Sequence, residues 1–367
     1  MEKSIFNNNK SDYNIPSLFL GEEMGVIDSI HKHYPELWKL YKKLKSQDWD
    51  ENEFDLTSCN RDFKTCSRTM YEMMLLTLAW QWEADSIASR SLYSIAAPFI
   101  SSTELNCLYP EIVRNENVHA LTYSEIFRNS FDNPEEIIPM VQKMSQVVER
   151  SEVVTSIFAE VYTTSHLLAL GEISRHDPIA YEAIFKFIVT MYCLERVQFM
   201  PSFSVTFAIA NSGIFVPAGK SVQKIAQDEL EIHVEAHKTT LDYELRTDRG
   251  LTTFNKLKPF IEVLLKDIIR TEVNWIKHLT SEGRELPGVD EASLIKWLMY
   301  CAKDPIVFFG MADKFEDLPS NNPLKFMNEW LNIDKIQVSP QEENPGGYLL
   351  GAISKTLGDT VLESEDL

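Results

Sequence analysis

Glycine is scarce in this chain, with 13 in 367 residues. Strand-and-turn proteins usually need more glycine than this for their turns, so the composition favours helices. Positive charge is also in short supply, because 35 Lys and Arg residues stand against 55 Asp and Glu residues and the net charge is -20. A surface this acidic repels a phosphate backbone, so we expect no nucleic-acid partner.

Cysteine is sparse as well. The chain has five, none in a CxxC pair: Cys59, Cys66, Cys107, Cys193 and Cys301. An odd, scattered set is typical of free thiols in a reducing compartment. No uncharged apolar run of about 18 or more residues is present, so we expect no membrane span. The polar, Asn-rich residues 1–14 do not resemble a signal peptide, and we expect a cytoplasmic protein.

Nucleotide-binding signatures are missing too, since the chain contains neither a P-loop nor a dinucleotide-binding fingerprint. What it does contain is apolar periodicity with helix-stop residues, which predicts a succession of long helices. The expected ranges are 28–45, 68–91, 103–129, 134–170, 178–211, 221–245, 260–279 and 291–301.

The two ends of the chain differ in character from the part between them. Pro340, Pro345, Gly346 and Gly347 lie within eight residues, and the last stretch is acidic and polar. We therefore expect three segments: a disordered N-terminus over 1–15, one helical domain over 16–336, and a flexible tail over 337–367.

One Glu-x-x-His motif, Glu116-Asn-Val-His119, lies on the expected helix after Thr103. Residues three apart point to one side of a helix, so this motif can offer a carboxylate and an imidazole to the same ion. Iron and manganese accept such oxygen and nitrogen ligands. Alone, a Glu-x-x-His pair is more often ordinary surface chemistry than a metal site.

Three further expected helices carry acidic residues in largely apolar surroundings. Asp85 follows the almost wholly apolar segment 73–82, and Glu195 lies in the apolar run 183–199. The fourth helix carries Asp228-Glu-Leu-Glu-Ile-His233. Singly, each acid would be interpreted as a cap or a salt-bridge partner. The order carboxylate, Glu-x-x-His, carboxylate, Glu plus His over four long helices is what a ferritin-like di-metal bundle requires.

The motifs around these residues resemble the small subunit of class I ribonucleotide reductase, over most of the chain from about Leu18 onward. They are Asp85-Ser-Ile with Arg90-Ser91, Glu116-Asn-Val-His119-Ala-Leu-Thr-Tyr123-Ser, Glu195-Arg-Val-Gln-Phe199 with Ser202-Phe203, and Ile225-Ala-Gln-Asp228-Glu229. Their separations also resemble those of the family, with 31 residues from Asp85 to Glu116 and 34 from Glu195 to Glu229. The resemblance implies an all-α, ferritin-like helical bundle with additional helices and a flexible C-terminal tail.

The resemblance implies two metal ions per subunit, iron in the first place, with manganese or a mixed pair as alternatives. One ion would be held by Asp85, Glu116 and His119. The other would be held by Glu195, Glu229 and His233, with Glu116 also bridging.

The resemblance further implies a radical on Tyr123, which would lose an electron and a proton when the reduced metals react with dioxygen. Tyr123 follows His119 by four residues, about one helical turn, so it is expected beside the metal site. An apolar pocket would protect the radical, and its residues would be Phe199, Phe203 and Ile225. The electron path outward would begin at Trp49 and Asp228, and Tyr348 in the tail would pass the hole to the large subunit.

The implied activity is therefore that of an oxidoreductase, the small subunit of ribonucleoside-diphosphate reductase. It would act as a homodimer, with dioxygen, and would bind the large subunit through its C-terminal tail.

The fourth motif departs from the family pattern. The family has Glu-x-x-His there, whereas Glu229 and His233 are four apart, with Leu230 at the position where a strict match would put glutamate. A one-residue insertion can be absorbed by a π-bulge, so the spacing predicts a locally widened helix. Glu231 and His237 stay open as substitute ligands. The family often has arginine at the position of Gln227, which affects the details of the electron path.

Three other functions could use the same residues. A ferritin-like di-metal oxidase or hydroxylase with its own substrate would need neither Tyr123 nor Tyr348. An iron-storage protein of the ferritin class is much shorter and lacks a long tail. A helical scaffold that has lost its metals would not keep all the ligand types.

Overall fold

The computed structural model describes residues 17–22, 26–27, 29–143 and 145–332. Across these residues the chain forms helices and no β-strand, apart from two isolated bridges, Phe19 with Ile100 and Leu286 with Val289. The all-α prediction is therefore confirmed. The expected disordered N-terminus over 1–15 and the expected tail over 337–367 lie outside the described residues.

The helices of the first half are α1 (Pro35–Ser46), α2 (Cys59–Thr65), α3 (Arg68–Ala96), α4 (Thr103–Ser130), α5 (Pro134–Gln142), α6 (Ser145–Leu170) and α7 (Pro178–Cys193). A π-helical segment, η1 (Leu194–Gln198), joins α7 to α8 (Phe199–Asn211). A second, η2 (Glu229–His233), joins α9 (Val216–Asp228) to α10 (Val234–Leu245). The chain continues through α11 (Asp248–Thr280), the 3-10 turn η3 (Ser281–Gly283), α12 (Glu291–Phe308), the 3-10 turn η4 (Ala312–Lys314) and α13 (Met327–Trp330).

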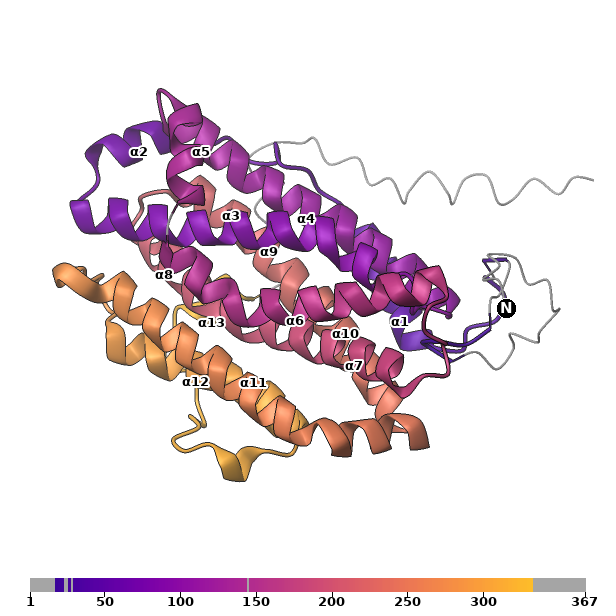
Figure 1. Ribbon diagram of the computed structural model, residues 1–367. Coiled ribbons are helices and arrows are strands. Elements are labelled where there is room, and N and C mark those ends of the chain that lie inside the picture. The colour runs from indigo at the N-terminus through magenta and orange to yellow at the C-terminus, as the bar shows by residue number, and fades with distance from the viewer. Residues whose placement is uncertain (1–16, 23–25, 28, 144, 333–367) are drawn as a thin grey trace, which may run out of the picture.

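Four helical stretches form the centre of the bundle: α3, α4, the continuous α7-η1-α8 and the continuous α9-η2-α10. In Figure 1, α3 and α4 run side by side along the bundle, and these two helices are in contact along their length. Helix α8 packs against α3, helix α9 packs against α4, and the two π-segments contact each other. This arrangement places a residue from each stretch toward a common interior.

Helix starts follow local sequence chemistry. Asp177 caps α7 by accepting a hydrogen bond from the Ile179 N–H, and Pro178 occupies the first turn, where no N–H is needed. Asp290 and Ser293 form a reciprocal capping box at the start of α12.

Several predicted helix bounds are wrong, and proline explains much of the error. Helix α1 begins at Pro35 rather than near 28, because proline is favoured in a first turn. Helix α11 begins at Asp248 and passes through Pro259, although the expected helix starts after that proline. Its added turns bury Phe254 and Leu257 against the core, and this packing outweighs the missing hydrogen bond.

One helical segment among the described residues, Glu149–Leu170 of α6, is long and apolar enough to cross a membrane by length and composition. It packs against α3, α7 and α11. Near its start, the buried Arg150 pairs with the buried Glu272 of α11, with 2.6 Å between Nε and Oε1. This ion pair holds the start of the segment against α11, while Tyr162 and Leu170 further along it are exposed.

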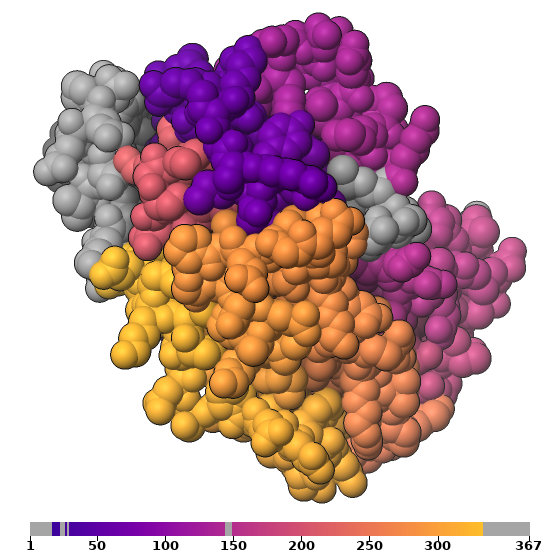
Figure 2. Space-filling view, turned by 90° about the vertical axis from the view of Figure 1, so that its left-hand side faces the viewer, coloured from indigo at the N-terminus to yellow at the C-terminus, as the bar shows by residue number. Residues whose placement is uncertain are grey.

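The N-terminal and C-terminal parts of the domain meet at one end of the bundle. In Figure 2 the indigo surface of the early helices lies directly against the orange surface of the residues near η3. Two ion pairs join these surfaces, Arg284 with Glu72 at 2.9 Å and Arg68 with Glu282 at 3.3 Å. The contact closes the bundle at the end where α3 begins.

Candidate metal centre

The six predicted ligands come together at the centre of the bundle from all four stretches. None of their side chains is more than 2% exposed. Helix α3 supplies Asp85, α4 supplies Glu116 and His119, η1 supplies Glu195, and η2 supplies Glu229 and His233. Burying so many acidic groups together is unfavourable unless cations compensate their charge.

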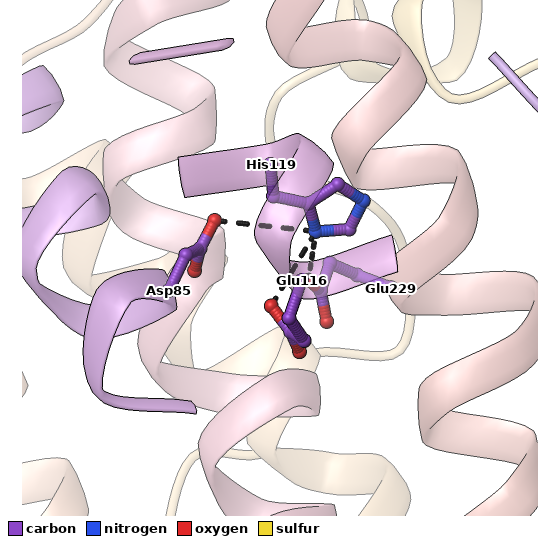
Figure 3. A group of neighbouring side chains, drawn as sticks. All are labelled: Asp85, Glu116, His119 and Glu229. Atoms are coloured by element: carbon purple, nitrogen blue, oxygen red, sulfur yellow. Dashed lines mark ion pairs between the residues drawn. The ribbon is translucent and has the colours of Figure 1, made fainter. Parts of the chain in front are cut away.

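Two overlapping groups of ligand atoms can be distinguished. Within each group the ligand atoms lie within 4.8 Å of one another. Figure 3 shows the first group, in which the carboxylates of Asp85, Glu116 and Glu229 converge on Nδ1 of His119. The second group is Glu116, Glu195, Glu229 and His233. Each group could hold one ion, and two residues belong to both.

The two shared glutamates are arranged alike. Glu116 directs Oε2 toward Nδ1 of His119 at 3.5 Å and Oε1 toward Nδ1 of His233 at 3.3 Å. Glu229 directs Oε1 toward His119 and Oε2 toward His233, both at 3.2 Å. A carboxylate that turns one oxygen to each half of a site is suited to bridge two ions. The sequence led us to expect bridging by Glu116 alone, and Glu229 stands in the same relation to both halves.

Outward hydrogen bonds orient His119. Asp228 lies behind His119, with 3.2 Å between Oδ2 and Nε2, and accepts a second hydrogen bond from Trp49 Nε1 at 2.7 Å. The Trp49 ring also stacks on the His119 ring, with centroids 5.9 Å apart. Because an ionised Asp228 can only accept, the His119 proton belongs on Nε2 and Nδ1 is left as the ligand atom.

Asn115 plays the matching part for His233. Its Oδ1 lies 2.9 Å from His233 Nε2, and its Nδ2 donates to Asp228 Oδ2 at 2.9 Å. The donation to Asp228 fixes which end of the amide is oxygen, so His233 Nε2 donates and Nδ1 faces the carboxylates. Both histidines therefore present the same nitrogen, and Asn115 connects their supports.

The widened helix predicted at the fourth motif is confirmed, because Glu229–His233 forms the π-segment η2. A π-turn takes more residues than an α-turn, so a four-residue spacing still places Glu229 and His233 on one side. The second π-segment, η1, contains Glu195 and was not predicted, since nothing in a lone glutamate motif reveals a changed helical turn.

The substitute ligands left open by the sequence lie elsewhere. Glu231 points to the side of α1, where it pairs with Lys43 at 2.5 Å and accepts from Gln47 at 3.3 Å. His237 belongs to neither group, but its Nε2 lies 3.3 Å from Glu195 Oε1. On its other side, His237 Nδ1 lies 3.2 Å from the Tyr109 hydroxyl.

Electrostatics at the centre reflect burial opposed by close partners. Burial and the neighbouring Glu116 carboxyl raise the pKa of Asp85 well above its ordinary value. Burial also raises the pKa of Glu195. For Glu116 burial is outweighed by His119 and His233, which lower its pKa to about 2. Burial lowers the pKa of His237 to about 3, so this third histidine is neutral at physiological pH.

The six side chains fit a pair of metal ions. Eight of their buried polar atoms have no hydrogen-bond partner, including both oxygens of Asp85 and of Glu229 and Nδ1 of both histidines. Buried polar atoms are normally paired, so this many unpaired atoms facing one interior indicates cations. Carboxylate oxygens with imidazole nitrogens are donors that iron and manganese accept.

Tyr123 is wholly buried, and its hydroxyl has no hydrogen-bond partner. Burial raises the pKa of Tyr123 well above its ordinary value, and the nearby Asp85 carboxyl adds to the rise. The three predicted pocket residues, Phe199, Phe203 and Ile225, are all buried, and the rings of the first two stack with centroids 5.5 Å apart. Tyr348, the predicted tail tyrosine, lies outside the described residues.

Two supporting residues, Asn115 and Tyr109, were missed by the sequence reasoning. A spacing signal was available for both, because residues four and seven apart on a helix share a face. Asn115 precedes His119 by four residues, and Tyr109 precedes Glu116 by seven. His237 likewise follows His233 by four.

Comparisons with known proteins identify the family of this chain. A family model of the ribonucleotide reductase small chain matches residues 27–323. The chain is similar to the ribonucleoside-diphosphate reductase subunit beta of Buchnera aphidicola subsp. Schizaphis graminum, at 24% identity over 372 residues, covering 98% of each chain.

Two solved structures share the fold. The ribonucleotide reductase R2 subunit of Clostridium botulinum is similar at a TM-score of 0.78 and 17% identity, covering 90% of this chain and 98% of that one. The dimanganese(II)-NrdF protein of Streptococcus sanguinis is similar at a TM-score of 0.64 and 16% identity, covering 80% of this chain and 94% of that one. With the family model matching most of its length, this chain belongs to the family of ribonucleotide reductase small chains.

Proposed function

We propose that this protein is the radical-generating small subunit of a class I ribonucleotide reductase, and that it forms and holds a tyrosyl radical on Tyr123. The observation that carries the proposal is the setting of Tyr123. Its side chain is fully buried, its hydroxyl is unpaired, and it lies one helical turn after His119. A phenol in this position can exchange an electron with a neighbouring metal centre while water is kept away.

The ligand set supports two ions held by Asp85, Glu116, His119, Glu195, Glu229 and His233. Bound there, a pair of redox-active ions would supply, with dioxygen, the oxidising power that a tyrosyl radical needs. The chain's own part is to bind, orient and exclude water. Glu116 and Glu229 face both histidines, so these carboxylates would hold the two ions at a fixed separation. About 3.5–4 Å is typical of two-metal sites.

Protection of the radical falls to the apolar surroundings. The three pocket residues are buried, and their side chains have no O–H, N–H or S–H group that could give a hydrogen atom to the radical: Phe199, Phe203 and Ile225. Phe199 follows Glu195 by four residues, and Ile225 precedes Glu229 by four, so each lies about one turn from a ligand. We propose that they form the dry pocket around Tyr123.

The path by which the radical hole would leave the site, as an electron moves inward to Tyr123, runs through hydrogen bonds already described. Trp49 is only 7% exposed and donates to Asp228, which in turn holds His119. We propose that this series connects the centre to the surface. Tyr348 would continue it from the tail, over residues 337–367, which would dock on the large subunit where ribonucleoside diphosphates are reduced.

The remaining assignments follow from the same proposal. Residues 16–336 would form the radical-generating domain, and two copies would pair as a homodimer in the cytoplasm. Iron is the first metal to test. Manganese is the second, because the Streptococcus sanguinis relative is described as a dimanganese(II) protein.

Electron paramagnetic resonance tests the proposal directly. The full chain is loaded with Fe(II) or Mn(II) without oxygen and then exposed to air. The wild-type protein should give a tyrosyl signal, whereas Tyr123→Phe should bind the same amount of metal and give none. Turnover with the large subunit should also be lost in Tyr123→Phe. An unchanged radical signal in Tyr123→Phe would overturn the assignment of the radical to this residue.

A further inference from the structure

One carboxylate of the metal centre has a support of its own on the side away from the ions. Glu195 Oε1 lies 3.3 Å from His237 Nε2, and His237 Nδ1 lies 3.2 Å from the Tyr109 hydroxyl. The three residues come from η1, α10 and α4, so the series spans three helical stretches. All three side chains are nearly inaccessible, at 1%, 0% and 0% exposed, so water does not compete for these contacts.

The direction of the hydrogen bonds follows from the chemistry of the groups. A metal-bound glutamate is ionised, so Glu195 can only accept and the imidazole proton must lie on Nε2. In a neutral imidazole Nδ1 then accepts, and the Tyr109 hydroxyl is the donor within reach. Tyr109 thereby selects the tautomer of His237 that can donate to Glu195.

The two oxygens of Glu195 consequently differ. Oε1 faces His237, whereas Oε2 is buried without a hydrogen-bond partner. The other carboxylate that belongs to only one ligand group, Asp85, shows no such division, since both of its oxygens are unpaired. Asp85 is thus free to offer one oxygen or two, and Glu195 is not.

We propose that Tyr109 and His237 are positioning residues that hold Oε1 of Glu195, so that Glu195 offers a metal ion Oε2 alone. The inference rests on the proposed function, because it concerns the same pair of ions. It assigns His237 a role as support rather than as a ligand. Glu195 sits on the π-segment η1, and its side chain makes no other hydrogen bond within the described part of the chain, so this support is what fixes its orientation.

Metal titration of the full chain measures the effect without relying on activity. Mn(II) is added without oxygen, and the unbound ion is counted from its electron paramagnetic resonance signal. Wild-type protein should bind two ions. His237→Leu, which cannot donate a hydrogen bond, should lower the affinity for one of the two ions by about 10- to 100-fold. This is the usual effect of losing a hydrogen-bond partner behind a metal ligand. His237→Gln keeps an N–H donor and should bind more tightly than His237→Leu.

Tyr109→Phe tests the far end of the series. It removes one hydroxyl and leaves the imidazole in place, so one ion should bind about 2- to 10-fold more weakly, as expected for one neutral hydrogen bond. Tyr181→Phe is the matched control. The Tyr181 hydroxyl is a buried donor to Glu244, which lies on the same α10 as His237 but outside both ligand groups. Tyr181→Phe should bind both ions as the wild type does.

A crystal structure of the Mn(II)-loaded wild-type protein gives an independent readout. Glu195 should bind through one oxygen, with the other within hydrogen-bond distance of His237 Nε2. Coordination by both oxygens of Glu195, or by His237 itself, would overturn the proposal.

The titration outcomes distinguish failure of the proposed function from failure of the positioning role. If the wild type does not bind two ions, both the proposed function and the positioning role are wrong. If the wild type binds two and His237→Leu binds them equally well, only the positioning role fails. If His237→Leu does not fold, as judged by circular dichroism, Tyr109→Phe decides the matter, and wild-type affinity in that variant would overturn the role of the pair.

Discussion

The two halves of the candidate metal centre are built in different ways. The half around Asp85 and His119 stands on the regular helices α3 and α4, whereas the half around Glu195 and His233 stands on the π-segments η1 and η2. Both halves end in the same kind of group, an imidazole Nδ1 facing Glu116 and Glu229. The two halves therefore place equivalent ligand atoms although one is built on α-helices and the other on π-helical segments.

The difference shows how the ligand side chains are oriented in each half. In the regular half, a three-residue spacing places Glu116 and His119 on one side of α4. Of Asp85 and His119, only His119 has a support behind it, Asp228, because both Asp85 oxygens are unpaired. In the widened half the backbone is less regular, and side chains behind the ligands supply orientation: Asn115 for His233 and His237 for Glu195. Such partners are commonly needed to fix ligand geometry.

Removing a shared carboxylate should have the largest effect, because it acts on both halves. In Glu116→Gln each ion loses a charged oxygen, and the affinity for both Mn(II) ions should fall by more than about 100-fold, beyond the loss of an outer partner. Asp85→Asn should lower the affinity only for the ion beside His119. Calorimetric titration with anomalous scattering would count and locate the ions. Selective loss of one ion in Glu116→Gln would contradict its bridging position.

Single-residue deletions should separate the two backbones. Deleting Val118 places His119 two residues after Glu116, which turns its side chain by about 100° and should abolish binding at that half. Deleting Glu231 leaves Glu229 and His233 three apart, the spacing that works in α4, and also removes the ion pair with half-exposed Lys43. Glu231 is buried but Lys43 is 44% exposed, so Lys43 can return to water when Glu231 is removed, and both ions should bind within about tenfold of wild type.

The pair of deletions is judged by the same Mn(II) titration, with circular dichroism to verify folding. Equal loss of binding in both variants would mean that η2 is an essential distortion rather than an accommodated insertion.

How far the sequence could predict this centre follows the same division. Glu116 and His119 are identified by spacing, and the four-residue gap from Glu229 to His233 predicted the widened helix that the structure contains. The π-turn at Glu195 could not be predicted in this way. Glu195 is the only expected ligand on its segment, so no ligand-to-ligand spacing indicates a widened turn there.

Helix bounds were predicted less well than helix existence. The expected helix over 260–279 starts too late, because α11 begins at Asp248 and its residues Phe254 and Leu257 pack into the core before Pro259. The break between α5 and α6 was missed as well, since apolar residues continue across it. Tertiary packing decides such cases, and a single sequence carries little information about it.

Asn115 links the supports of the two halves, and its loss should rank next in size. In Asn115→Leu both Asp228 and His233 Nε2 lose a partner. Both Mn(II) ions should bind about 10- to 100-fold more weakly, as for other partners behind ligands. Asn117→Leu is the control, because Asn117 is exposed on the same helix and bonds only to the Val113 carbonyl. An effect on one ion alone would refute the linking role.

Trp49→Phe should have the smallest effect on metal binding, and it should be confined to one half. Phenylalanine can keep the stacking on His119 but loses the N–H that donates to Asp228 at 2.7 Å. Asp228 still accepts from Asn115, so His119 stays supported and its ion should bind only about 2- to 10-fold more weakly. The ion beside His233 should be unaffected. Trp297→Phe is the matched control, because Trp297 is also buried but donates to the Met200 carbonyl, and it should change neither affinity.

Under the proposed function, Trp49→Phe should also form the Tyr123 radical yet fail to turn over with the large subunit, since the path outward is interrupted after the radical is made. Anomalous scattering at low Mn(II) distinguishes the two ions. Equal weakening of both would show that the Trp49 and Asp228 hydrogen bond serves the whole centre, and the view that the two halves have separate supports would then be wrong.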